Sequence, residues 1–329
     1  MRTKEIKSKH NPEKLVSGGR ISEAFRNLMA RMLGNRVTIS LHDMQNLSAL
    51  KDGGMLAVAP HNSHVDSLVV RWSIRLFVRA VHQKHKLKSK LENPSVFAAP
   101  LKQKREKKYE ELPESLLDIT PKEADAILKN LIILAAADYW FPNPNDRIHK
   151  KAFALFKSCI AQTVIRIMPI TRQRSGRGRE STQKSTEDLH KIANLVKNGA
   201  ISTIFPEGTR SRDHTVPLDE RRFLSGLGLL AAFTGGNKPI VPMVIEGTGK
   251  IWPPHKSIPK LRNNSVDVTV GQPIHFDSLV PENIEAMDDK ELRLLRKQIS
   301  QLVTTYFQSF GKEELESEEE DVVFGSADY

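Results

Sequence analysis

Apolar residues recur along this chain in two patterns: short uninterrupted runs, and longer stretches in which they return every three or four positions. The runs are typical of buried strands, and the longer spacing is typical of amphipathic helices. Strands are predicted at residues 55–59, 164–170, 200–205, 240–245 and 266–270. Helices are predicted at residues 20–33, 67–81, 185–198, 222–233 and 289–310. This alternation predicts an α/β fold, with a largely parallel or mixed sheet flanked by helices and with amphipathic helices near both ends.

A further helix is predicted after Thr120, which is followed by Pro121 and, at the third helical position, by Glu123. This combination forms a capping box with proline in the first turn. The apolar spacing continues through Leu134 toward Phe141, so we expect the helix to extend well past residue 130. The single cysteine, Cys159, lies in another apolar helical pattern; we interpret it as a core residue, and it excludes an internal disulfide.

The charged residues divide the chain unevenly. The 329 residues carry a net charge of +11, but residues 311–329 alone carry −7, so the rest carries +18. We expect one domain over residues 1–310, with its core at roughly 50–280, and a disordered acidic tail at 311–329. Residues 82–120 are interpreted as a basic insertion, because nine lysines and arginines occur between 82 and 108, with Pro94 and Pro100 breaking any long helix.

A net charge of +18 on residues 1–310 favours anionic partners: phosphorylated metabolites, anionic lipid surfaces, an acidic carrier protein or nucleic acid. Arg71, Arg75 and Arg79 lie at successive i, i+4 positions, either as a solvated helix face or as a guide for phosphate groups. No apolar run approaches the roughly 18 residues that a membrane span needs, and the first ten residues lack the apolar stretch of a secretory signal. We therefore expect a cytoplasmic protein without a spanning helix.

The first chemical motif is His61-Asn62-Ser63-His64-Val65-Asp66, directly after the run at 55–59. A histidine and an aspartate five positions apart cannot share a face of one helix, because five residues rotate by about 140°. They can meet if His61 lies in the turn after the strand and Asp66 in the first turn of the next helix. The carboxylate would then accept one ring proton and leave the other nitrogen as a general base.

The second motif, residues 205–211 with the sequence Phe-Pro-Glu-Gly-Thr-Arg-Ser, follows another apolar run. Two polar loops at the ends of two strands, one with a base and one with an arginine, predict a site at one edge of the sheet. No serine or cysteine lies in a nucleophile elbow, and no phosphate-binding glycine loop of the nucleotide-hydrolysing type is present. The loosely spaced histidines (His61, His64, His82, His85) have no cysteine partners, which argues against a metal site.

A base without a nucleophile suits a substrate that brings its own hydroxyl group. The two motifs together resemble those of the glycerolipid and lysophospholipid acyltransferase family, which includes 1-acyl-glycerol-3-phosphate and glycerol-3-phosphate acyltransferases. Ile170-Thr171-Arg172, Phe223-Leu224-Ser225-Gly226 and Ile240-Val241-Pro242-Met243 resemble weaker family blocks and occur in the right order. The resemblance covers roughly residues 50–250, with a longer spacing than usual between His61 and Arg172 and without the hydrophobic N-terminal segment of many members.

The resemblance implies a glycerol-3-phosphate acyltransferase-like fold and an enzyme of phospholipid biosynthesis. His61, oriented by Asp66, would activate a hydroxyl of a glycerol phosphate or lysophospholipid for attack on an acyl thioester. The thioester would come from acyl-CoA or an acyl-carrier protein, and no cofactor is expected. Arg172 and Arg210 would bind the acceptor's phosphate, Glu207 would bind a glycerol hydroxyl or fix an arginine, and Gly208 would allow close backbone approach; Thr209 belongs to the same loop.

Because the acceptor and the product would partition into a bilayer, we expect peripheral, electrostatic association with the inner face of an anionic membrane, through residues 82–108 and the helix at 20–33. No nucleic acid is expected as a partner. The oxyanion of the reaction would need donors, for which backbone N–H groups near the two motif loops are the best candidates. The alternative interpretation is a non-catalytic basic module that binds anionic lipid or nucleic acid. It rests on the +18 body, although aromatic residues are only 6% of the chain and no nucleic-acid signature is present.

Overall fold

The computed structural model describes residues 37–63, 65–92, 112–136, 167–170, 179–208, 226–252, 264–281, 283–313 and 323–324. Several predicted features lie outside these residues. They are the helices at 20–33 and around Cys159, and the site candidates Arg172, Thr209 and Arg210.

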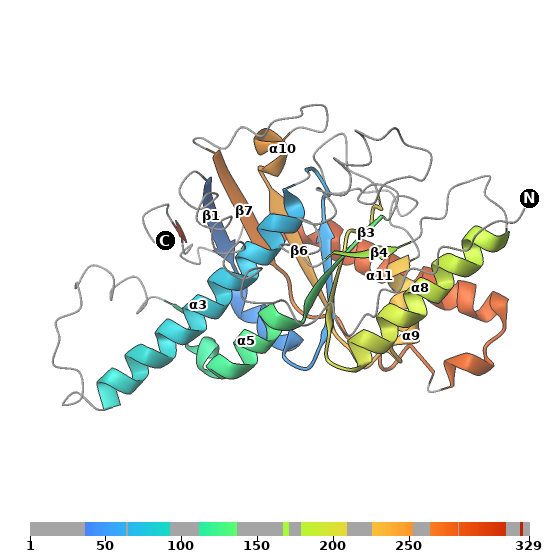
Figure 1. The fold of residues 1–329 in the computed structure, drawn as a ribbon, viewed down its shortest axis with the longest axis horizontal. Helices are drawn as coiled ribbons and strands as arrows, with labels where there is room; N and C mark the ends of the chain where they lie inside the picture. The colour runs from blue at the N-terminus through green and yellow to red at the C-terminus, as the bar shows by residue number, and fades with distance from the viewer. Residues whose placement is uncertain are drawn as a thin grey trace, which may run out of the picture.

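The strands form one mixed sheet in the order β4-β3-β5-β2-β6-β7-β1-β8 (Figure 1). Their bounds are β1 Val37–His42, β2 Gly54–Ala59, β3 Leu131–Ala136, β4 Ile167–Ile170, β5 Ile201–Ile204, β6 Ile240–Glu246, β7 Asn264–Val270 and β8 Val323–Phe324. From β4 to β6 all neighbours are parallel, β7 is antiparallel to β6, and β1 is parallel to β7. The prediction of a largely parallel or mixed α/β sheet is confirmed.

Helices cover both faces of this sheet. The helical bounds are α3 Asp66–Glu92, α5 Pro121–Asn130, α8 Arg179–Lys197, α9 Gly226–Phe233, α10 Thr248–Ile251 and α11 Asp289–Glu313, with 3-10 turns η1 Met44–Leu50, η3 Glu114–Leu117 and η6 Ile284–Ala286. One core cluster joins the sheet to α3, α5, η1 and η3, and the other joins it to α8, α9 and α11. Because β2 lies between these layers, all six of its residues are buried, as its uninterrupted apolar sequence predicts.

The stretch after Thr120 differs from its prediction. The capping box and Pro121 begin α5 as expected, and hydrogen bonds from the Thr120 side chain and backbone lower the pKa of Glu123. The helix ends at Asn130, however, and Leu131–Ala136 form β3 between β4 and β5. The predicted continuation of the helix was therefore wrong. A short apolar run fits a buried strand as well as a helix, and here its pairing with β4 and β5 decides.

The predicted basic insertion also differs in its first part, because α3 continues without a break to Glu92. Lys84 is buried; its Nζ donates to the carbonyl oxygen of Leu112 over 2.7 Å and pairs with Glu114 over 2.6 Å. Leu112, Leu116 and Ile119 belong to the core beside α3. The described parts of residues 82–120 are thus an exposed end of α3, as far as Glu92, and a packed connection from Leu112 onward.

Three smaller boundaries shift as well. α8 begins at Arg179 rather than at a Ser185 cap, and ends before Gly199, which adopts a φ of 90° as predicted for a stop. α11 continues past Gly311 to Glu313. Within the tail predicted to be disordered, Val323 and Phe324 form β8, which pairs antiparallel with Ser40 and Ile39 of β1.

None of the described helices has both the length and the apolar content that crossing a bilayer requires.

Candidate active site

The two motif loops leave the sheet side by side. β2 and β5 are parallel neighbours, with Leu56 opposite Thr203 and Ala57 opposite Ile204, so their carboxyl ends reach the same edge. His61 follows β2, and residues 205–208 follow β5. β4 and β6 end at this edge too, because they run parallel to these strands. An edge where parallel strands end is where α/β folds usually place their binding sites.

His61 and Asp66 form a hydrogen-bonded pair. Nδ1 of His61 lies 2.8 Å from Oδ2 of Asp66, whose side chain is fully buried, whereas that of His61 is 20% exposed. An ionised carboxylate can only accept hydrogen bonds, so the proton between the two groups belongs to Nδ1 of His61. Nε2 of the neutral ring is then left as an acceptor. The spacing of five works as predicted, because His61 lies in the loop and Asp66 is the first residue of α3.

The Asp66 carboxylate is fixed by the loop that it follows. Its Oδ2 also accepts hydrogen bonds from the backbone N–H groups of Asn62 and Ser63, each over 2.8 Å. The start of a helix favours negative charge as well, because its first N–H groups carry unpaired partial positive charge. These donors hold the carboxylate in one orientation, and therefore hold the imidazole ring too.

The second loop supports the first. The Oε1 of Glu207 accepts a hydrogen bond from the backbone N–H of His61 over 2.8 Å, and Glu207 is only 7% exposed. The Phe205 ring stacks on the imidazole, with centroids 4.2 Å apart and an angle of 28° between the planes. Gly208, at a φ of 62°, donates its N–H to the Phe205 carbonyl over 2.9 Å and closes the turn. Glu207, which was predicted to bind a glycerol hydroxyl or to fix an arginine, thus uses one carboxylate oxygen to hold the backbone of His61.

A third segment, α10, approaches the same loop from β6. The hydroxyl of Ser63 donates to the carbonyl oxygen of Trp252 over 2.9 Å and accepts the N–H of Val65 over 3.3 Å. Ser63 is fully buried. Its hydroxyl is therefore a structural link, which agrees with the absence of a nucleophile elbow in the sequence.

The backbone amides of the two loops are largely committed to this scaffold. The N–H groups of His61, Asn62 and Ser63 go to carboxylates, and that of Val65 goes to a hydroxyl. Those of Asp66 and Gly208 go to the carbonyl oxygens of Ser63 and Phe205. These six amides, which the sequence suggested as oxyanion donors, serve to hold the His61–Asp66 pair instead.

The remaining predicted residues have different outcomes. Thr209 and Arg210 directly follow Gly208, and Arg172 follows the end of β4, but none of the three is among the described residues, and neither is His64. The histidines weighed as metal ligands have other partners: His82 pairs with Asp125 over 3.1 Å, and His85 lies 3.0 Å from the Ile119 carbonyl. Over the described ranges, no three histidine, cysteine or acidic side chains gather as metal ligands do.

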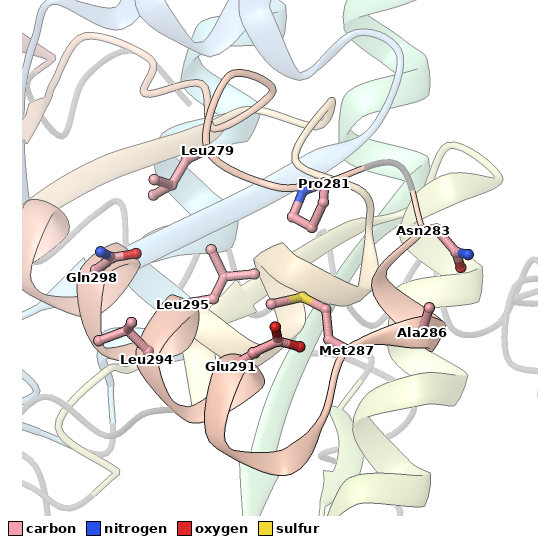
Figure 2. Close-up of a pocket in the computed structure, with 9 residues that line it drawn as sticks. All are labelled: Leu279, Pro281, Asn283, Ala286, Met287, Glu291, Leu294, Leu295 and Gln298. Atoms are coloured by element: carbon pink, nitrogen blue, oxygen red, sulfur yellow. The ribbon is translucent and has the colours of Figure 1, made fainter.

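A groove of about 420 Å³ lies away from this site, between α11 and the chain before it (Figure 2). Its lining includes Leu279, Met287, Leu294 and Leu295, with Glu291 pointing toward the same space. The N–H of Leu279 donates to the carbonyl oxygen of Phe276, and the N–H of Phe276 donates to the carbonyl oxygen of Gly236. Gly236 lies just before the amino end of β6. This part of the groove is therefore at the sheet edge opposite His61.

Comparison with known proteins gives the class. Residues 148–246 match the family model described as Acyltransferase. This stretch is therefore similar to acyltransferases, in agreement with the resemblance that the motifs suggest. The matched residues include Arg172 and the loop with Glu207, whereas His61 and Asp66 precede them.

Two curated plant proteins are similar over 115 residues, which is 35% of this chain. One is the chloroplastic 1-acyl-sn-glycerol-3-phosphate acyltransferase BAT2 of Brassica napus, at 33% identity, and the other is the chloroplastic enzyme LPAT1 of Arabidopsis thaliana, at 32%. The match spans only 29% and 28% of these relatives. Among solved structures, the 1-acyl-sn-glycerophosphate acyltransferase PlsC of Thermotoga maritima aligns over 89% of this chain and 84% of its own, with a TM-score of 0.37 and 16% identity.

Proposed function

We propose that the protein is an O-acyltransferase that moves a fatty acyl group from an acyl thioester to a hydroxyl of a glycerol phosphate or lysophospholipid. The observation that carries the proposal is the His61–Asp66 pair, a partly exposed imidazole held by a buried carboxylate at the edge where the parallel strands end. The names of the similar plant proteins supply the acceptor class, a 1-acyl-glycerol 3-phosphate.

In this mechanism Nε2 of His61 removes the hydroxyl proton as the acceptor oxygen attacks the thioester carbonyl carbon. The carbonyl oxygen becomes an oxyanion in the tetrahedral intermediate. When the intermediate collapses, the carbon–sulfur bond breaks, and the thiolate takes the proton back from the imidazolium. The products are an ester and a free thiol, and the histidine returns to its starting state. Asp66 stabilises the transient positive charge on the ring.

The experiment that tests this function is an assay of the purified protein with acyl-CoA and acyl-carrier protein donors against glycerol 3-phosphate and 1-acyl-glycerol 3-phosphate. Mass spectrometry should show an acceptor that gains one acyl group in a protein-dependent reaction. A protein that binds these anions and yields no acylated product with any pair would support the alternative of a non-catalytic basic module.

Arg172→Ala and Arg210→Ala should weaken the use of phosphorylated acceptors far more than the use of the donor. Guanidinium groups bind phosphate through charge-assisted hydrogen bonds, worth roughly 1.5–3 kcal/mol each, or about 10- to 150-fold in kcat/KM for the acceptor. The measurement compares each variant on 1-acyl-glycerol 3-phosphate and on the monoacylglycerol without phosphate. Equal losses on both acceptors would assign the two arginines a structural role.

We also propose that the protein attaches to membranes peripherally and electrostatically, because the acylated product partitions into a bilayer. The contributing segments are the amphipathic sequence at 20–33 and the cations between 93 and 108, five lysines and arginines against one glutamate. Each cation near an anionic surface contributes about 1 kcal/mol, within a Debye length of about 8 Å at physiological salt.

Co-sedimentation should therefore show binding to vesicles that contain anionic lipid, little binding to neutral vesicles, and release by 1 M salt. Deleting residues 314–329 should tighten the binding, because this segment carries seven acidic and no basic side chains, which would otherwise compete for the basic segments. A matched variant replaces these seven carboxylates by their amides and keeps the length of the chain. Equal binding to neutral vesicles would show that apolar insertion anchors the protein.

A further inference from the structure

The outward face of α3 carries a straight row of basic side chains, which we name the basic face of α3: Arg71, Arg75, Arg79, His82 and Lys86. At 100° per residue these five positions fall within an arc of about 80°, and at 1.5 Å per residue they span about 22 Å. The three arginines are partly exposed, and His82 and Lys86 are exposed. The three arginines and His82 also make interactions within the protein.

This row leads directly to the active site. α3 begins at Asp66, the partner of His61, and Arg71 lies five residues farther along the axis, or about 8 Å. Figure 1 shows α3 running from the edge that carries the motif loops, across the sheet and beyond the body of the domain. A partner that binds along this helix therefore has one end beside the imidazole.

We propose that the basic face of α3 docks an acidic acyl-carrier protein, whose flexible arm presents the acyl thioester to His61. The inference rests on the proposed function and names the donor class. A row 22 Å long and one side chain wide matches an acidic helix laid along it, and complementary charges of this kind guide association and orientation. A coenzyme A thioester is compact, and its phosphates need a small cluster of cations rather than an extended row.

The composition of this surface favours a protein over a membrane. Helices that lie on membranes present bulky apolar side chains beside their cations. Among the described residues, the exposed large apolar side chains are Leu294 and Leu302, both on α11, which packs in the other core cluster. Beside α3, η3 and α5 carry exposed carboxylates, Glu114 with 80% and Asp125 with 60% of the side chain accessible, and Asp125 pairs with His82 of the row. A flat anionic surface would meet both carboxylates, whereas a single acidic helix can lie along the three arginines and Lys86.

The test uses charge reversal on this face, with the triple variant Arg75→Glu, Arg79→Glu, Lys86→Glu. The matched control makes the same change in net charge on the opposite side of the sheet: Lys197→Glu, Arg293→Glu, Lys297→Glu, three exposed cations of α8 and α11. A neutral triple, Arg75→Gln, Arg79→Gln, Lys86→Gln, provides the test if the reversed protein does not fold. For each protein, kcat/KM is measured with palmitoyl-carrier protein and with palmitoyl-CoA, at a fixed concentration of 1-acyl-glycerol 3-phosphate.

We expect kcat/KM with the carrier protein to fall about 20- to 100-fold in the reversed variant, through KM, and about fivefold in the neutral one. With palmitoyl-CoA all variants should stay within about threefold of the parent, and the control should do so with both donors. Equal loss with both donors, or no loss with the carrier protein, overturns the inference. Unchanged carrier kinetics with lost binding to anionic vesicles assigns the face to a membrane and overturns it as well.

A binding measurement separates this inference from the proposed function. Fluorescence anisotropy of labelled holo-carrier protein should show binding that the reversed variant loses and the control keeps. The binding should weaken as salt rises from 0.1 M to 1 M, because the Debye length shrinks from about 10 Å to 3 Å. Docking without acyl transfer from either donor would refute the proposed function alone. Transfer from both donors without measurable docking on α3 would refute this inference alone.

Discussion

His61→Ala is expected to lower kcat for acyl transfer by about 10²- to 10⁴-fold while the protein remains folded, because the substitution removes the general base. The imidazole is partly exposed and lies in a loop, so its loss leaves no large cavity in the core. The measurement is steady-state turnover with one thioester donor and 1-acyl-glycerol 3-phosphate, together with a thermal melt. His190→Ala, which removes an exposed histidine stacked on Phe233 in the other layer, is the matched control.

Asp66→Asn should also be severe, because the amide cannot replace the charge that stabilises the imidazolium, and it disturbs the ring tautomer. The amide oxygen can still accept the N–H groups of Asn62 and Ser63, so the loop keeps these bonds. Turnover of His61→Ala within a factor of a few of the parent would contradict the mechanism, whatever the effect at Asp66.

Glu207→Ala is expected to lower kcat by about 10²-fold with a smaller change in KM, because it leaves the His61 N–H without its acceptor and frees the loop that carries the base. A displacement of about 1 Å from the reactive geometry can cost this much. Glu207→Gln keeps an acceptor oxygen at the same place and should recover most of the activity. If Glu207 instead binds the acceptor directly, both variants should raise KM for the acceptor, and the glutamine variant should show little recovery.

The elements that the sequence predicts well are those whose local pattern agrees with their place in the sheet. β2 and the first six residues of β6 are apolar runs, and β5 has isoleucines at both ends around the buried Ser202 and Thr203; all three lie in the buried, parallel part of the sheet. β1 has a readable signal that was not used: Val37, Ile39 and Leu41 alternate with polar residues, the period of a half-buried strand. β3 was missed because Leu131–Ala136 follow α5 with no residue between them, and pairing partners far along the chain decide its conformation.

The candidate site divides in the same way. The pairing of His61 with Asp66 follows from their spacing and from the strand-to-helix change between them, which are local. The contact between His61 and Glu207 joins residues 146 positions apart and depends on β2 and β5 being neighbours. The stacking of Phe205 on the imidazole depends on the same adjacency. A single sequence does not encode such adjacency in any local pattern, so these supporting roles required the structure.

The central claim is that Asp66 holds the His61 ring with Nε2 ready to accept a proton. Nitrogen-15 NMR of the histidine-labelled protein tests it most directly, with the His61 signals assigned by their absence in His61→Ala. In the neutral ring we predict the proton on Nδ1 and an unprotonated Nε2, and a loss of this preference in Asp66→Asn. A neutral ring that carries its proton on Nε2 would contradict the account.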